Sequence, residues 1–299
     1  MCGIVGLFLK REDTRSELGR LFSPMLVEMT SRGPDSAGVA VYRNPSPAEC
    51  WKLTSFNPDP GFDWDRVAAR LSEELQAETV AEPNDTHCVI LCDGDPASAV
   101  EVIEQSDCTQ VMSVGRLVEI YKETGLPRDV VERFGLESMR GSHAVGHTRM
   151  ATESAVTTAG SHPFSTGPDI CLVHNGSLSN HNRLREMLER TQGMRFRTEN
   201  DTEVAAAYVT HRLQMGRSLH AAFEDCIDAL DGFYTFVAAT AGGFAVLRDP
   251  IACKPALLAE TEEYVAFGSE YRALAGLPGI GNAEVWEPEP ALVYSWGID

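Results

Sequence analysis

The 299-residue chain is long enough to bury a substantial hydrophobic core, in one large domain or two. Its 25 Lys and Arg against 44 Asp and Glu give a formal net charge of −19, which argues against nucleic acid and anionic membranes as partners. The sequence has no apolar run of about 18 residues or more, so we expect no membrane span.

Eight cysteines are spread along the chain without a repeating interval. Cys88 and Cys92 form a C-x3-C pair, but no second Cys pair and no His pair follows, so we expect neither a disulfide framework nor a metal site. The charged residues 10–13 follow only a short apolar run, which is not typical of a signal peptide. This cysteine usage suits a reducing cytoplasm, and we expect a cytoplasmic protein.

The first 60 residues predict strands, a helix and two irregular stretches. Gly3–Leu9 is an apolar run typical of a buried strand. Residues 18–29 carry apolar side chains at helical spacing, although Ser23-Pro24 could start a second short helix. The turn-rich residues 31–38 lead into a strand at 39–42, and the proline-containing residues 44–60 predict an irregular excursion.

Residues 60–140 predict a small inserted α/β lobe, because helical and strand patterns alternate there. The expected helices are at 64–77, 96–105 and 117–124, and the expected strands at 88–92 and 110–114. No glycine-rich phosphate loop accompanies them.

The second half predicts three helices between groups of strands. A strand at 170–173 runs into His174-Asn-Gly176, and helices are expected up to residue 193, at 200–216 and at 219–232. Strands are expected at 233–239, 244–248, 256–259, 264–267 and 292–294. Strand-rich ends with helices grouped between them favour an α+β fold with antiparallel sheets.

The second residue, Cys2, is a candidate nucleophile. If Met1 is removed, as we expect before a small residue, Cys2 carries its thiol beside a free α-amine of pKa about 7.7–8.0. A thiol of reference pKa about 8.5 is mostly protonated at neutral pH, and that amine can take its proton. The alternative is a cysteine on an ordinary first strand.

Four further motifs follow in order: Arg32–Gly38, Gly146–Thr152, His174–Gly176 and Asn200–Glu203. Together with Cys2 they resemble the class II glutamine amidotransferases, whose glutaminase domain has an N-terminal-nucleophile hydrolase fold. The resemblance implies a four-layer αββα sandwich with two antiparallel sheets. It implies an amidotransferase domain over residues 1–299, with the lobe at 60–140 inserted in it.

The resemblance also implies catalytic roles. Cys2 would attack the side-chain amide of glutamine, and the Asn175 side chain and the Gly176 backbone N–H would hold the oxyanion. Loss of one such donor costs roughly 3–4 kcal/mol of transition-state stabilisation. The residues alone leave open that His174-Asn-Gly176 is a tight turn.

Three residues would bind the amino-acid end of the substrate by the same resemblance. Arg149 would pair with the α-carboxylate, helped by Thr152, and Asp201 would hold the α-ammonium. The alternatives are a structural ion pair for Arg149 and a helix N-cap for Asp201. We expect Arg32 and Asp35 to brace the site.

Two further histidines and two departures from the family pattern complete this region. His147 and His162 are expected to be structural. Met150 replaces an aromatic residue found in some relatives, and Glu153 replaces a His found in others. A carboxylate at Glu153 would repel the substrate carboxylate unless it is turned away or neutralised.

Four stretches, 119–122, 147–154, 248–255 and 287–290, are similar to the amidotransferase-like (A) subunits of N-methylglutamate synthases of methylamine metabolism. This resemblance implies a hetero-oligomer in which partner synthase subunits carry FMN and iron–sulfur clusters and this chain carries no cofactor. Its substrate would be glutamine or glutamate. The alternatives are an ammonia-donating subunit of a split glutamate synthase and a non-catalytic interaction subunit.

Overall fold

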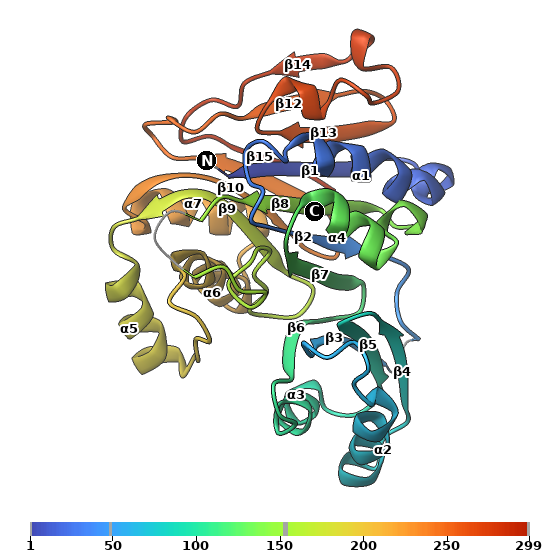
Figure 1. Ribbon diagram of the computed structural model, residues 1–299. Helices are drawn as coiled ribbons and strands as arrows, with labels where there is room; N and C mark the ends of the chain where they lie inside the picture. The colour runs from blue at the N-terminus through green and yellow to red at the C-terminus, as the bar shows by residue number, and fades with distance from the viewer. Residues whose placement is uncertain (1, 48–49, 152–154, 298–299) are drawn as a thin grey trace.

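Two antiparallel sheets form the centre of the computed structural model, which describes residues 2–47, 50–151 and 155–297 (Figure 1). The first sheet comprises β1 (Gly3–Leu9), β2 (Ser36–Tyr42), β7 (Val118–Thr124), β8 (His143–Arg149), β12 (Leu257–Glu260), β13 (Tyr264–Gly268) and β14 (Glu284–Trp286). Its strand order is β14-β12-β13-β1-β8-β2-β7. The second sheet comprises β9 (Cys171–Leu178), β10 (Gly232–Ala239), β11 (Phe244–Arg248) and β15 (Val293–Trp296), in the order β15-β11-β10-β9.

The strand β1 shows why its sequence is apolar at successive positions. Ile4 belongs to the cluster of apolar side chains packed between the two sheets. Val5 and Leu7 belong to the cluster on the opposite face, which is covered by helices. Because β1 is buried on both faces, its sequence shows no apolar–polar alternation.

Helices cover both outer faces of the sheet pair. The helices α1 (Leu18–Glu28) and α4 (Pro127–Phe134) pack on the first sheet, and α5 (His181–Gln192), α6 (Asp201–Gln214) and α7 (Leu219–Ala229) pack on the second. Short 3-10 helices lie at Glu12–Glu17, Leu136–Ser138, Tyr271–Ala273 and Ile280–Asn282. This arrangement confirms the predicted four-layer αββα sandwich. Pro24 lies inside α1, so no second helix starts at Ser23.

A separate lobe lies beyond β7 (Figure 1). Its helices are α2 (Trp64–Leu75) and α3 (Pro96–Glu104). Its strands are β3 (Trp51–Phe56), β4 (Thr79–Asn84), β5 (His87–Cys92) and β6 (Gln110–Gly115), and they form an antiparallel sheet in the order β4-β5-β3-β6. This sheet begins inside the stretch expected to be irregular and ends at residue 115, whereas the lobe was expected at 60–140.

The prediction of a helix at 117–124 is wrong, because these residues form β7, which pairs with β2 along its whole length. Polar side chains in this strand are buried, and their hydrogen-bond partners are distant in sequence. Glu119 accepts hydrogen bonds from Lys52 and Arg43, at 2.8 Å each. None of the helices in the described ranges is long and apolar enough to cross a membrane.

Candidate active site

Cys2 lies at the start of β1, in the middle of the first sheet. Gly3 pairs with Thr148 of β8, so the next step of this antiparallel register brings Cys2 opposite Arg149. The Cys2 carbonyl oxygen accepts hydrogen bonds from Arg32 Nε at 2.8 Å and from Asn175 Nδ2 at 3.2 Å. Cys2 is half-buried, and these two donors hold its backbone from two different elements.

Asn175 and Gly176 lie within β9, and Gly176 pairs with Tyr234 of β10. The alternative of a tight turn at His174-Asn-Gly176 is therefore wrong. A Cβ atom on Gly176 would lie 2.0 Å from the carbonyl oxygen of Phe233, so only glycine fits there. One N–H of the Asn175 amide is donated to Cys2, and the amide carries a second N–H for another acceptor.

Arg149 is the last residue of β8, and its side chain is buried. Its Nη1 donates to the carbonyl oxygen of Ala155 at 3.3 Å. Its own carbonyl oxygen accepts from the backbone N–H of Asp35 at 3.1 Å, and the Asp35 carboxylate accepts from the Ala151 N–H at 2.8 Å. Asp35 thus fixes the end of β8. The predicted Thr152, and Glu153 beside it, lie outside the described residues.

Asp201 is the first residue of α6, and the N-cap is Asn200, whose side chain accepts from the Thr202 N–H. The N-cap alternative for Asp201 is therefore wrong. Asp201 Oδ2 instead accepts from the Leu178 N–H at 2.9 Å, and Oδ1 lies 3.5 Å from His174 Nδ1. Burial raises the pKa of Asp201, but the hydrogen bond from His174 and its charge outweigh that effect, and the pKa lies below its usual value.

Three buried histidines lie behind these residues. His147 Nε2 contacts the carbonyl oxygen of His174 at 3.0 Å, and the rings of His147 and His162 stack with centroids 4.0 Å apart. His162 Nε2 and His174 Nδ1 both contact the hydroxyl of Thr202, at 2.8 and 3.0 Å. Burial lowers the pKa of His147 to about 3, and that of His162 well below its usual value. Both are neutral near pH 7, so these contacts support a structural role for them.

Arg32 was expected only to brace the site, yet it contacts the main chain of Cys2 directly. It is buried and also pairs with Glu270 at 2.7 Å. The hydrogen bond from Arg32 lowers the pKa of Glu270. Ser269 accepts from the Ile4 N–H at 2.9 Å, so the segment after β13 supports β1 as well. The sequence does not reveal this support, because nothing local to residues 268–270 indicates contact with a residue more than 260 positions away.

The arrangement combines a thiol, amide donors on β9, an arginine at the end of β8 and a carboxylate at the start of α6. Such a set can attack a carbonyl carbon, hold the resulting oxyanion and bind the charged ends of an amino acid. Among the described residues, no group of three or more His, Cys, Asp or Glu side chains is placed to hold a metal ion.

The chain is similar to known proteins over its whole length. A family model described as a glutamine amidotransferase domain matches residues 147–276. The glutamine amidotransferase-like protein GlxB of Rhizobium meliloti is 54% identical over 99% of this chain and 98% of its own length. A putative glutamine amidotransferase of Methanothermobacter thermautotrophicus is 32% identical over 98% of this chain and 99% of its own length.

The fold is similar to that of a solved structure of glutamine phosphoribosylpyrophosphate amidotransferase from B. subtilis. The TM-score is 0.61 at 19% sequence identity. The match covers 99% of this chain and 49% of that chain, so this chain spans about half of the solved protein. At this identity the likeness concerns the fold alone.

Proposed function

The chain belongs to the class II glutamine amidotransferase family, and we propose that it hydrolyses the side-chain amide of glutamine through a thioester on Cys2. The observation that carries this proposal is the contact between Asn175 Nδ2 and the Cys2 carbonyl oxygen at 3.2 Å. This contact joins the start of β1 to the His174–Gly176 motif, more than 170 residues away.

The reaction begins when the Cys2 thiolate attacks the amide carbon of the substrate. The carbonyl π electrons move to oxygen, and the Asn175 amide and the Gly176 N–H stabilise that oxyanion. The C–N bond then breaks, and ammonia leaves with the proton that the α-amine of Cys2 had taken from the thiol. Water adds to the thioester in a second tetrahedral step, which releases glutamate and restores the thiol.

Arg149 and Asp201 hold the substrate in this proposal. The planar guanidinium of Arg149 suits the α-carboxylate, and the Asp201 carboxylate suits the α-ammonium. Support comes from the low pKa of Asp201, which keeps it charged near pH 7. Thr152 remains a prediction for the carboxylate end.

The finer part of the proposal is that this chain is the amidotransferase subunit of an N-methylglutamate synthase-like complex. Partner synthase subunits would carry FMN and iron–sulfur clusters and would consume the ammonia, and this chain would carry no cofactor. Support comes from the four sequence stretches that are similar to such subunits. An ammonia donor to a split glutamate synthase is the alternative within the same chemistry.

The test starts with intact-mass measurement of the chain purified from cells together with its bound partners, where we expect Met1 to be absent. The complex should release ammonia and glutamate from glutamine, and Cys2→Ser should abolish this release. A glutamine analogue with a diazoketone in place of the amide should alkylate Cys2. Full retention of Met1, or no ammonia release by the wild-type complex, would refute catalysis at Cys2 and leave a non-catalytic interaction subunit. Equal turnover by Cys2→Ser would refute Cys2 as the nucleophile.

The identity of the co-purified partners decides whether the chain works in an N-methylglutamate synthase-like complex or in a split glutamate synthase. Subunits with bound FMN and iron–sulfur clusters that form N-methylglutamate from methylamine would support the proposal. Partners that form only glutamate from 2-oxoglutarate would favour the split glutamate synthase.

A further inference from the structure

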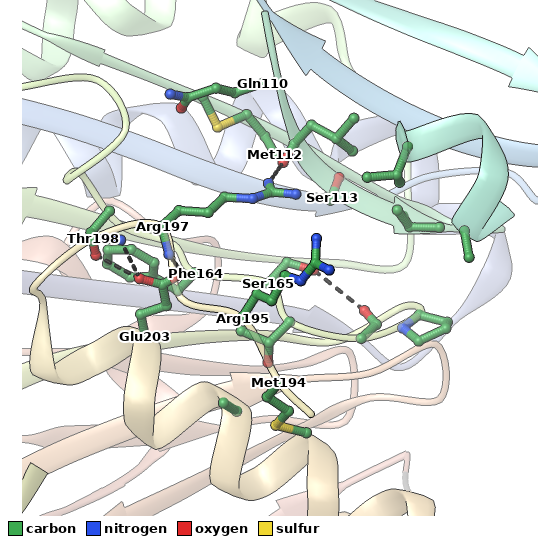
Figure 2. A pocket seen from close by; sticks show the side chains of 18 of the residues that line it. Gln110, Met112, Ser113, Phe164, Ser165, Met194, Arg195, Arg197, Thr198 and Glu203 are labelled. Carbon is green, nitrogen blue, oxygen red and sulfur yellow. Dashed lines mark hydrogen bonds between the residues drawn. The ribbon is translucent and has the colours of Figure 1, made fainter. Parts of the chain in front are cut away.

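A cavity of about 460 Å³ lies where the lobe meets the core (Figure 2). Its described walls come from α3 and β6 of the lobe and, in the core, from residues 159–168, residues 192–198 and α6. None of the described active-site residues lines this junction cavity. Its volume is in the range of small-molecule sites.

The charge of the lining is opposite to that of the whole chain. Among the described residues, the cavity is lined by three basic side chains, Lys122, Arg195 and Arg197, and by one acidic side chain, Glu203. The whole chain has a formal net charge of −19. Burial lowers the pKa of Lys122 to about 7, and Arg197 pairs with Glu104, so Arg195 is the basic side chain whose charge an anionic ligand can use.

Two of these charges are already used within the protein. Lys122 is buried, and its ammonium donates to the carbonyl oxygens of Ala159, Ser161 and Pro163. The Glu203 carboxylate accepts from the backbone N–H groups of Arg197 and Thr198 and from the Thr198 hydroxyl. Both side chains therefore hold the walls in place.

Arg197 and Arg195 follow α5 on the same loop but differ in their contacts. Arg197 crosses to the lobe, where it donates to the carbonyl oxygen of Val111 and pairs with Glu104 at 2.6 Å. Arg195 has no hydrogen-bond or ion-pair partner in the part of the chain that the structure describes, and Figure 2 shows it directed into the cavity. Its guanidinium is available to a ligand.

A buried hydroxyl on the lobe side is also unused. Thr54 of β3 pairs with Ser113 while Ser55 pairs with Val111, so Met112 is an extra residue that makes a β-bulge. Ser113 is only 3% exposed, and its Oγ has no hydrogen-bond partner among the described residues. Bulges often redirect side chains at functional sites, and a buried unpaired hydroxyl requires an explanation.

The remaining lining is largely apolar and lies on both sides of the junction. Its apolar side chains include Val100, Met112, Phe164, Met194 and Ala207. Such a surface suits the apolar or aromatic body of a ligand.

We propose that the junction cavity binds a small organic anion, a carboxylate or phosphate attached to an apolar or aromatic body. Arg195 pairs with the anionic group, and the body packs against Met112, Phe164 and Met194. The Ser113 hydroxyl is buried in the unliganded chain, and it turns about its Cα–Cβ bond to donate its proton to the ligand. The bound anion contacts the lobe and the core at once. This proposal does not depend on catalysis at Cys2.

Calorimetric titration of the full chain with phenyl phosphate, phenylacetate and benzyl alcohol tests the proposal. We expect one site for at least one of the two anions, and at least about tenfold weaker binding of the neutral alcohol. The preferred anion distinguishes a phosphate ligand from a carboxylate ligand. Arg195→Gln should weaken anion binding about tenfold, which is the effect of losing a charged hydrogen-bond partner.

Arg183→Gln on the exposed face of α5 is the matched control, and it should leave binding unchanged. Ala97→Trp should weaken binding by filling the cavity from α3. Bound anion should also slow amide hydrogen exchange at 110–115 and 193–200. Three results would overturn the proposal. They are equal anion binding by Arg195→Gln and wild type, no heat from either anion up to about 10 mM, and slowed exchange confined to residues outside 110–115 and 193–200.

Discussion

The Cys2 site and the junction cavity differ in how their polar side chains are used. In the Cys2 site, Asn175 and Arg32 hold the Cys2 carbonyl oxygen, and Asp201 holds the Leu178 N–H. In the junction cavity, Arg195 and the Ser113 hydroxyl have no partner among the described residues. Groups that hold one another preorganise a site for chemistry, whereas unpaired groups leave hydrogen-bonding capacity for a ligand.

The largest effect is expected from Asn175→Ala, which removes the proposed oxyanion donor and the contact that joins β9 to Cys2. We expect kcat for glutamine hydrolysis to fall about 10²- to 10³-fold. Asn182→Ala, on the exposed face of α5, is the control and should retain full activity. If kcat of Asn175→Ala stays within about threefold of wild type, the oxyanion role is wrong.

A smaller effect is expected from Asp201→Asn, since the amide oxygen can still accept from the Leu178 N–H while the charge is lost. We expect KM for glutamine to rise about 10- to 100-fold, as for the loss of a hydrogen bond to a charged group. Thermal stability should change little. Asp225→Asn breaks ion pairs with Arg212 and Arg217 instead, and it should lower stability without changing KM. If Asp201→Asn instead lowered thermal stability and left KM unchanged, Asp201 would be a purely structural residue.

The Cys2 site could largely be predicted because its residues belong to short contiguous motifs. Cys2 directly precedes β1, Arg149 ends β8 and Asn175 lies within β9, and the order of the motifs indicates that these segments meet. What the sequence could not give is the partner of each group. Arg32 was expected to brace the site, but its contact with Cys2 and its pairing with Glu270 depend on strands far apart in the chain.

The lobe and its junction with the core were predicted less well, for a physical reason. In β7, Glu119 and Lys122 are buried. Glu119 accepts from Lys52 of β3 and from Arg43, and Lys122 donates to carbonyl oxygens of residues 159–163. In the sequence, the charged residues of this stretch resemble the exposed face of a helix. In the structure they form a buried polar network. The junction cavity is assembled from several separate segments, so no local pattern indicates it.

The packing between the lobe and the core can be tested by measuring how stability depends on pH, because His87 of β5 lies in this contact. Its ring is fully buried against Phe56, Tyr121 and Phe134. Burial, with smaller effects of Lys122 and Arg133, lowers the pKa of His87 to about 3. The unfolded chain takes up this proton below about pH 6.5. The free energy of unfolding should therefore fall as the pH drops from about 6.5 toward 3, by about 1.4 kcal/mol per pH unit for this residue.

His87→Phe should remove this contribution and keep the aromatic packing. Urea unfolding of wild type and variant at pH 8, 6 and 5 measures it. At pH 8 His87 is neutral in both the folded and the unfolded state, so any difference there reports packing alone. Parallel pH curves for the two proteins would show that His87 is not kept neutral in the folded junction.

The smallest effect is expected from Glu104→Gln, which breaks the ion pair between Arg197 and the lobe. The two side chains are 43% and 30% exposed, so we expect a loss of at most about 1 kcal/mol in the free energy of unfolding, and less at 1 M NaCl. Glu186→Gln, which breaks a pair with Arg190 inside α5, should have a similar global effect. Only Glu104→Gln should speed amide exchange at 193–200, because of these two pairs it is the Glu104–Arg197 pair that joins the lobe to the core. A loss above about 3 kcal/mol would mean that this pair is a main tether of the lobe. The junction would then be held together by charged groups that bind one another, as the Cys2 site is. The difference between paired groups in one region and unpaired groups in the other would disappear.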